Sequence, residues 1–358
     1  MNHYLKQILV CLALGIAIQL NASTNHRIIV EAGNAESLLS AITQANQQNS
    51  DSLAERLFIL IPDGYYDLGQ RVLTEISGHN ISLVGQSMDQ TIIRNAPDKA
   101  EEGISKTAVI RNTGTGTYIE CLTLRNDLDY YGSNAAGRAV CLQDRGTRTI
   151  CRQVRMLSYQ DTYYSDNLTC QHYFSESEIH GTIDFICGAG DVYFDHCTLV
   201  AEPRTLDGKG RDVIAAPRTD QTPWGYVFES CTIRSEKSDF HYGRGWHTKP
   251  RMALLNTTLL SPEKLATTRY DSQGMRTVES LFYEYHTMDA TGSDITPHTN
   301  VVTFTLGDQR REHETILTKE EASRYRLENI FPDWRPEILM SSISAQAGKM
   351  KAEAWPKR

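Results

Sequence analysis

A six-residue pattern decides the fold of this chain: FDHCTL at residues 194–199 returns as FESCTI at residues 228–233. The first and last positions are apolar, and the fourth is small or apolar. Four further segments share the pattern, namely IECLTL at 119–124, CRQVRM at 151–156, FSESEI at 174–179 and LNTTLL at 255–260. Successive copies begin 32, 23, 20, 34 and 27 residues apart, which is too irregular for propeller blades or leucine-rich repeats. This spacing favours a parallel β-solenoid, whose turns keep their strands while their loops vary in length.

Short apolar runs extend the strand pattern toward the N-terminus. Residues 57–61 and 81–84 are such runs, and turn residues separate them. A β-sandwich is the alternative, but the hairpin turns that it needs are few. Helices are expected after Asn34, a suitable cap, and after the capping box at residues 318–321. Because helices would cover both open ends, the sequence predicts an all-β, single-stranded parallel β-helix with short capping helices at both ends.

The first 22 residues have the composition of an export signal. Lys6 supplies a positive charge, residues 8–20 form an almost unbroken apolar run, and small residues follow. An uncleaved membrane anchor is the alternative, but the run is shorter than the ~20 residues that span a bilayer. We therefore expect a signal peptide at residues 1–22 and one domain at residues 23–358. The mature protein would be secreted or periplasmic, without stable membrane association.

Composition and charge exclude several classes of protein. The 358 residues are 40% hydrophobic and 22% charged, as in globular proteins. Lys and Arg total 36 against 44 Asp and Glu, a net charge of -8, so no nucleic acid partner is expected. No Cys or His cluster has zinc-site spacing, so we expect neither metal nor cofactor. Cys197 and Cys231 occupy the fourth position of consecutive copies, with α-carbons about 5 Å apart if stacked, which predicts a disulfide bond.

Two aspartates occupy the same place in consecutive turns. Asp161 and Asp184 each lie 10 residues after the start of a six-residue copy. Parallel strands stack ~4.8 Å apart, so we expect both side chains to point the same way, roughly 5 Å apart. Two carboxylates this close resist ionising together, and a neighbouring cation can hold one as the anion while the other keeps its proton. The spacing predicts an acid/base pair with a nucleophile; two solvated surface aspartates are the alternative.

The sequence around these aspartates resembles the pectin methylesterase family. The resemblance rests on YQDT at 159–162, GTIDFICG at 181–188 and GRGW at 243–246, in the family's order, and it extends from Ile28 to Trp334. It implies a right-handed parallel β-helix and a carbohydrate esterase. Such an enzyme hydrolyses the methyl esters of galacturonate units in pectin (homogalacturonan), releasing methanol and pectate. We expect a monomer whose partner is the pectin chain.

The resemblance also implies a role for each matching residue. Asp184 would be the nucleophile that forms an acyl-enzyme, and Asp161 would protonate methanol and then activate water. Arg244 would keep the nucleophile ionised, and Gln160 would donate a hydrogen bond to the developing oxyanion. The aromatic positions near the sugar subsites match Trp246, Tyr164 and Phe185.

Two positions depart from the family pattern. Residues 138–142 read RAVCL where many members have QAVAL, and Cys187 stands where a second Phe is common. Arg138 precedes Asp161 by 23 residues, the interval that also separates Asp161 from Asp184. This interval predicts that Arg138 lies in the active groove and donates to the oxyanion or binds a free carboxylate. An exposed loop arginine is the alternative.

Two other functions fit the same residues. Carboxylates ~5 Å apart also serve retaining glycosidases, so a β-helical glycosidase acting on pectin is one alternative. A non-catalytic pectin-binding solenoid is the other. Arg244 beside a carboxylate favours an ester nucleophile, and a pure binder has no need of a proton-sharing pair.

Overall fold

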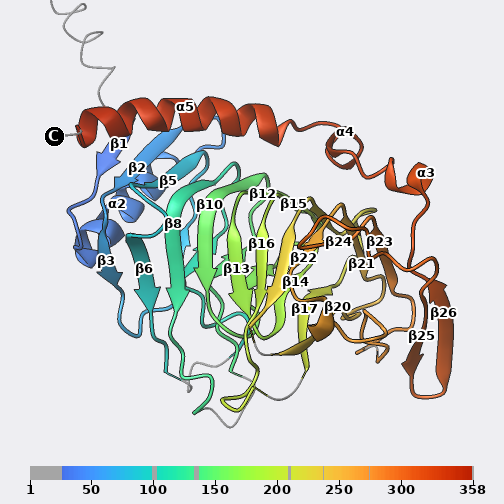
Figure 1. Ribbon diagram of the computed structural model, residues 1–358. Helices are drawn as coiled ribbons and strands as arrows, with labels where there is room; N and C mark the ends of the chain where they lie inside the picture. The colour runs from blue at the N-terminus through green and yellow to red at the C-terminus, as the bar shows by residue number, and fades with distance from the viewer. Residues whose placement is uncertain are drawn as a thin grey trace, which may run out of the picture.

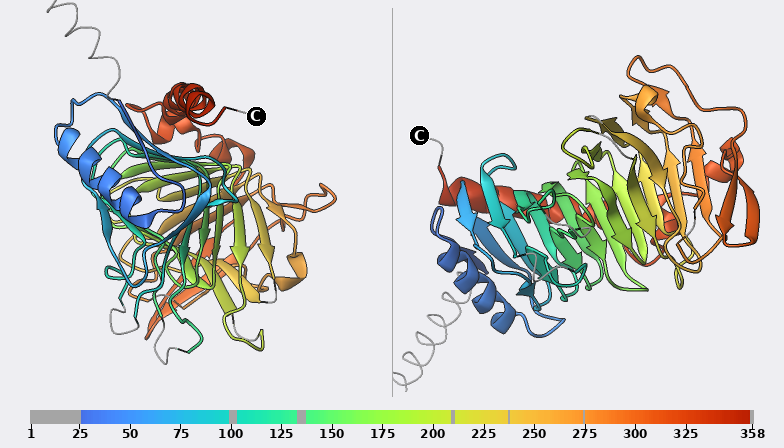
Figure 2. Two further views of the ribbon diagram at one scale, coloured as in Figure 1. Left: turned by 90° about the vertical axis from the view of Figure 1, so that its left-hand side faces the viewer. Right: turned by 90° about the horizontal axis from the view of Figure 1, so that it is seen from below.

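The computed structural model describes residues 26–98, 103–132, 137–208, 211–236, 238–273 and 275–356. The export segment predicted at residues 1–22 lies outside these residues. The described chain winds into a right-handed parallel β-helix, whose turns stack along one axis (Figures 1 and 2). This confirms the solenoid that the six-residue pattern predicts.

Each turn of the β-helix contributes strands to three faces, and within each face the neighbouring strands pair in parallel. The first face consists of β1 (Arg27–Ile29), β2 (Leu57–Ile61), β5 (Ile81–Gly85), β8 (Tyr118–Asn126), β10 (Thr149–Leu157), β12 (Gln171–Ser175), β15 (Asp191–Asp195), β18 (Tyr226–Glu229), β21 (Arg251–Leu255) and β23 (Leu281–Tyr285). The second face shares β8 and β10, which continue around the corner, and adds β3 (Gly64–Asp67), β6 (Thr91–Asn95), β13 (Glu178–Gly181), β16 (Thr198–Ala201), β19 (Thr232–Ser235), β22 (Thr258–Leu259) and β24 (Met288–Asp289). The third face consists of β4 (Thr74–Ile76), β7 (Ile110–Asn112), β9 (Leu142–Asp144), β11 (Tyr163–Ser165), β14 (Ile183–Gly188), β17 (Arg211–Pro217) and β20 (Asp239–Gly243).

The six-residue pattern marks the corner between the first and second faces. Its third residue has a left-handed backbone, with φ between 50° and 54°, at Cys121, Gln153, Glu176, His196, Ser230 and Asn256. The strand pairing sets Phe228 opposite Leu254, so the sixth copy spans residues 254–259, one residue earlier than predicted. Because positions 254, 255, 259 and 260 are all Leu, the apolar pattern could not fix the register there.

The interior is filled by side chains that repeat from turn to turn. The rings of Phe174, Phe194 and Phe228 stack at centroid distances of 4.9 and 4.7 Å. Cys197 and Cys231 lie opposite each other in the same way, but both are free thiols. The predicted disulfide is therefore wrong. In-register side chains keep their β-carbons about as far apart as the strands, ~4.8 Å, whereas a disulfide needs a mean of about 3.8 Å.

The two ends of the β-helix are closed by different elements. Helix α2 (Ala35–Gln48) covers the N-terminal end, and the Asn34 side chain accepts a hydrogen bond from the Ser37 N–H, as the predicted cap requires. At the other end the expected helical cap is replaced by an antiparallel hairpin of β25 (Val301–Leu306) and β26 (Gln309–Glu314), whose Phe304 joins the core (Figure 2). A 3₁₀ turn, η2 (Pro262–Lys264), precedes this end.

The C-terminal helices run back along the outside of the first face. They are α3 (Lys319–Ala322), which begins at the predicted capping box, α4 (Leu327–Ile330) and α5 (Pro336–Ala354) (Figure 1). Ile343 and Ala347 of α5 are buried against the outer apolar side chains of the first face. The Arg27 Nη1 atom lies 2.5 Å from Glu353 Oε2, and the Ser344 hydroxyl donates to Glu120 at 2.6 Å. The last helix is therefore bonded to the first turns.

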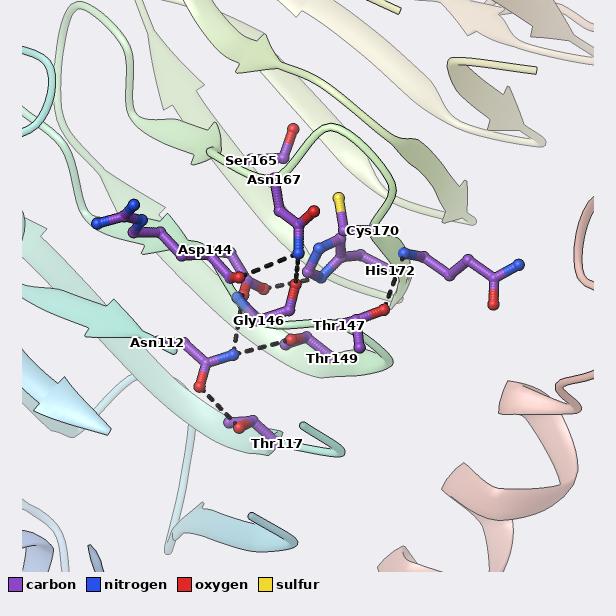
Figure 3. A network of polar contacts seen from close by, with 12 residues as sticks. Asn112, Thr117, Asp144, Gly146, Thr147, Thr149, Ser165, Asn167, Cys170 and His172 are labelled. Atoms are coloured by element: carbon purple, nitrogen blue, oxygen red, sulfur yellow. Dashed lines mark hydrogen bonds and ion pairs between the residues drawn. The ribbon is translucent and has the colours of Figure 1, made fainter. Parts of the chain in front are cut away.

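A buried polar network supports the third face from inside (Figure 3). His172 Nδ1 lies 2.8 Å from Asp144 Oδ2, and both side chains have no exposed surface. Asn112 donates to the other carboxylate oxygen at 2.8 Å. Burial opposes protonation of the imidazole, but Asp144 and Cys170 outweigh it and raise the pKa of His172 to about 10. The network is thus a charged pair that fixes β9 and the start of β12.

Candidate active site

The outer surface of the third face carries the predicted site. Its strands are in register, so Gln143, Tyr164, Cys187 and Ala216 form one row of neighbouring side chains across β9, β11, β14 and β17. Tyr164, Cys187 and Ala216 belong to a small apolar cluster outside the main core. This row therefore runs across successive turns on the outer surface of the third face, where the sequence predicts the active groove.

Both aspartates lie beside this row and have unusual backbones. Asp161 has φ 60° and Asp184 has φ 53°, a left-handed conformation that is uncommon outside glycine. A β-bulge interrupts the pairing of β14 with β17 between Ile183 and Ile186. Bulges re-aim side chains, and here the bulge turns Asp184 away from the interior. The carboxylates are almost covered, with 4% exposure for Asp161 and 6% for Asp184.

Arg244 follows β20 and donates two hydrogen bonds to the Asp184 carboxylate. Its Nε donates to Oδ1 at 2.8 Å, and its Nη2 donates to Oδ2. The Arg244 N–H donates to the Ala215 carbonyl oxygen at 3.0 Å, which anchors the arginine to β17. This bidentate contact both orients the carboxylate and stabilises its anion.

The two carboxylates differ in their affinity for a proton. Burial raises the pKa of Asp161 well above its usual range, and the charge of Asp184 raises it further, while Arg138 and Arg244 oppose these effects. Burial also raises the pKa of Asp184, but the direct contact with Arg244 lowers it. Both pKa shifts are upward, but only Asp184 has an arginine in direct contact that favours its anion. Such a difference in surroundings can assign an acid and an anion to a pair of carboxyl groups.

The remaining predicted polar residues lie at the same place. Arg138 Nε is 3.7 Å from Asp161 Oδ2, and its side chain is 42% exposed. Arg138 pairs with Gln160 across the strands, one residue away from the register that the interval of 23 suggested. The Gln160 carbonyl oxygen Oε1 is buried and has no hydrogen-bond partner within the described ranges. Arg138 and Gln160 thus lie beside the Asp161 carboxyl group.

Two of the three predicted aromatic residues face the groove. The ring centroids of Tyr164 and Trp246 are 6.1 Å apart, and the Arg218 guanidinium lies 5.7 Å from the Trp246 ring. Phe185, in contrast, is fully buried in the main core, so its prediction as a substrate-binding residue is wrong. Because of the bulge, Phe185 and Ile186 both point inward, and position 187 is the next to face the groove.

Cys187 and Arg204 also act on the two carboxyl groups, although no sequence pattern indicates this. The Cys187 thiol lowers the pKa of Asp161, and the charge of Arg204 lowers the pKa of Asp184. Strict alternation of inward and outward residues does not predict the effect of Cys187, because the bulge changes which residues of β14 face outward. Arg204 lies in a loop after β16, where no local pattern signals proximity to the site.

Two other features, a metal cluster and a membrane-spanning helix, are absent from the described residues. No three His, Cys, Asp or Glu side chains gather there in a way that could hold a metal ion. No helix in that part of the chain has the length and apolar character needed to cross a membrane.

The fold and the site define a right-handed parallel β-helix protein with two buried carboxyl groups on its third face, one of them bound by an arginine. The pectinesterase family model matches residues 28–325, and the chain belongs to the pectinesterase family. Probable pectinesterase 30 of Arabidopsis thaliana is 28% identical over 250 residues, which are 67% of this chain and 48% of that protein. The chain therefore spans about half the length of this relative.

Solved structures of pectin methylesterases share the fold. The enzyme from Erwinia chrysanthemi superposes with a TM-score of 0.64 at 22% identity, covering 82% of this chain and 93% of that one. The enzyme from carrot superposes with a TM-score of 0.64 at 17% identity, covering 85% and 92%. Another pectin methylesterase, solved in complex with a hexasaccharide, has a TM-score of 0.65 at 22% identity, covering 86% and 98%.

Proposed function

We propose that the chain hydrolyses the methyl esters of galacturonate units in pectin, releasing methanol and leaving pectate. The observation that carries the proposal is the bidentate contact of Arg244 with Asp184 beside a second buried carboxyl group, Asp161, whose pKa burial raises. Family membership selects the ester as the bond that this pair cleaves. The proposed reaction uses only side chains of the protein and needs neither a metal ion nor a cofactor.

The proposed reaction has two stages on one pair of carboxylates. In the first, an Asp184 oxygen attacks the ester carbonyl carbon, and the negative charge moves to the carbonyl oxygen. The carbon–methoxy bond then breaks as Asp161 gives its proton to the departing oxygen, so methanol and an acyl-enzyme form. In the second, the Asp161 carboxylate takes a proton from water, and hydroxide attacks the acyl carbon. Asp184 leaves as a carboxylate, Asp161 keeps the proton it took from water, and the new galacturonic acid group loses its own proton to solvent as pectate is released.

The neighbouring residues would stabilise the intermediates. Gln160 and Arg138 lie beside Asp161 and would donate hydrogen bonds to the oxyanion, a contribution typically worth 10²–10³ in kcat per donor. Tyr164 and Trp246 would contact the sugar rings on either side of the reacting unit. Export through the segment at residues 1–22 would bring the mature monomer, residues 23–358, into contact with pectin outside the cytoplasm.

Methanol release from highly methylated homogalacturonan tests the proposal. The parent should release methanol without a matching increase in reducing ends, whereas a glycosidase would raise the reducing ends. Asp184→Asn and Asp161→Asn should each abolish release, because an amide can neither attack as the anion nor cycle a proton. Activity within about tenfold of the parent, only ~1.4 kcal/mol of barrier, would contradict the assigned role. Substrate binding without release by the parent would instead favour a non-catalytic binder.

A further inference from the structure

A cavity lies around the corner from Asp161 and Asp184, at the edge of the second face. It has a volume of about 380 Å³ and is formed where β8, β10, β13 and β16 of the second face end. The lining residues that matter here are Arg125, Asp127, Tyr131, Tyr159, His180 and Glu202. We call it the corner pocket. None of these residues belongs to the site described above, although Tyr159 precedes Asp161 by two positions.

Tyrosines form one wall of the corner pocket. The Tyr159 ring stacks on Tyr130 at 5.0 Å between centroids, and Tyr131 meets Tyr159 edge to face at 5.3 Å. The Tyr131 hydroxyl donates to the Pro203 carbonyl oxygen at 2.7 Å. This bond ties the loop after β8 to the loop after β16, so the wall is held in place before a ligand arrives.

The cations of the corner pocket are already paired with carboxylates. Arg125 Nε lies 2.6 Å from Asp127 Oδ1. His180 Nδ1 lies 2.6 Å from Glu202, and its Nε2 lies 2.5 Å from Glu178. A carboxylate only accepts hydrogen bonds, so both ring nitrogens carry protons and His180 is an imidazolium. The charges of the four lining groups therefore cancel.

This balance selects the charge of a ligand. A free uronate carboxylate would find no uncompensated cation in the corner pocket and would meet Asp127 and Glu202. A neutral sugar ring fits better, because its hydroxyls can donate to carboxylates and its apolar face can lie on a tyrosine. Glu202 Oε1 accepts from His180, while Oε2 has no hydrogen bond among the described residues. That oxygen is available to sugar hydroxyls.

We propose that the corner pocket is an accessory subsite for an uncharged sugar ring. The ring is either a methyl-esterified galacturonate unit of the backbone or a neutral sugar of a side branch. The proposal extends the proposed function, since it makes the enzyme retain esterified or branched regions of its polymer beside the catalytic groove.

Calorimetric binding tests the proposal without turnover, on full-length Asp184→Asn protein. Three probes are compared: fully methyl-esterified hexagalacturonate, unesterified hexagalacturonate and a neutral galacto-oligosaccharide. Glu202→Gln should weaken the binding of one or both neutral probes about tenfold, because a charge-assisted hydrogen bond is lost. Binding of the unesterified probe should not change. Glu178→Gln is the matched control, because it removes the other carboxylate on His180 but does not line the pocket.

A second pair of variants separates the aromatic wall from the charges. Tyr159→Leu removes the aromatic face and should weaken the binding of the same neutral probe about tenfold. Tyr159→Phe keeps that face and should bind the probe like its parent. A loss for the esterified hexamer identifies the backbone as the source, and a loss for the galacto-oligosaccharide identifies a branch. The proposal is overturned if Glu202→Gln binds both neutral probes like its parent, or if Glu178→Gln weakens them equally. If the parent releases no methanol but these losses persist, the proposed reaction fails and the subsite stands.

Discussion

Replacing Arg244 by Gln should convert the enzyme into one that works only at alkaline pH. Two of the guanidinium nitrogens contact Asp184, and the side chains are 22% and 8% exposed. For unit charges about 4 Å apart at an effective dielectric of ~20, the lost attraction is about 4 kcal/mol. Ionisation of Asp184 becomes harder by up to that amount, since burial already raises the pKa of this carboxyl group.

The expected loss at neutral pH is therefore up to ~10³-fold, because 1.36 kcal/mol corresponds to a factor of ten. Removing the cation raises the pKa of Asp184, so the acid limb of the pH profile should move upward and activity should recover as pH rises. Arg244→Lys is the comparison. It keeps the charge but loses the bidentate geometry, so its loss should be smaller and nearly independent of pH.

The assay is initial methanol release from methylated homogalacturonan between pH 5 and 9, with enzyme-free blanks because alkali saponifies the ester. Circular dichroism and thermal unfolding of each variant control for loss of the fold. Equal losses for Arg244→Gln at pH 5 and pH 9 would refute the idea that the guanidinium controls ionisation. Neutral-pH activity within about tenfold of the parent would refute the calculated magnitude.

Three further outcomes are expected. Arg138→Ala should lower kcat by about 10²-fold, as expected for an oxyanion donor, and Arg138→Gln should retain more; equal turnover by the parent and both variants would place Arg138 outside the chemistry. Cys187→Ala should move the alkaline limb of the pH–activity profile to higher pH, because the Cys187 thiol lowers the pKa of Asp161. In Cys187→Ser this limb should stay at the pH of the parent. An alkaline limb at the same pH in all three proteins would count against this contact. The ion pair of His172 with Asp144 should stabilise the fold fully below pH ~6.5 and lose its effect as pH rises through the His172 pKa of about 10. Calorimetry should therefore show that the Tm of the parent falls more above pH 8 than the Tm of His172→Gln. Parallel curves of Tm against pH would contradict this.

The sequence predicts the stacking of turns because the same side chains recur at the corners. It also predicts that Asp161 and Asp184 are neighbours, and in the structure the charge of Asp184 acts on Asp161. Sequence alternation fails at Phe185, where the bulge adds one residue to β14. It also fails at residues 254–260, where repeated leucines leave two registers equally apolar. The bulge in β14 depends on contacts between turns, so a linear pattern does not encode it.

Contacts between distant loops were also beyond sequence reasoning. The Tyr131 hydroxyl and the Pro203 carbonyl oxygen are 72 residues apart in the chain, and nothing near either residue indicates the other. The same holds for Arg204 and its charge at Asp184. Loops of a solenoid can vary in length without disturbing the strands, so the pattern that determines the fold carries little information about the walls of its pockets.

The position of helix α5 changes how the whole stack should come apart. A solenoid bonded only between adjacent turns can fray from either end, one turn at a time. Here the bond from Arg27 to Glu353 joins residues 326 positions apart, and Ser344 reaches Glu120 over 224 positions. Separation of the N-terminal turns must therefore also break their contacts with helix α5. Docking of α5 connects turns that are not neighbours in the stack, so resistance to proteases and to pulling forces should rise once this helix is in place.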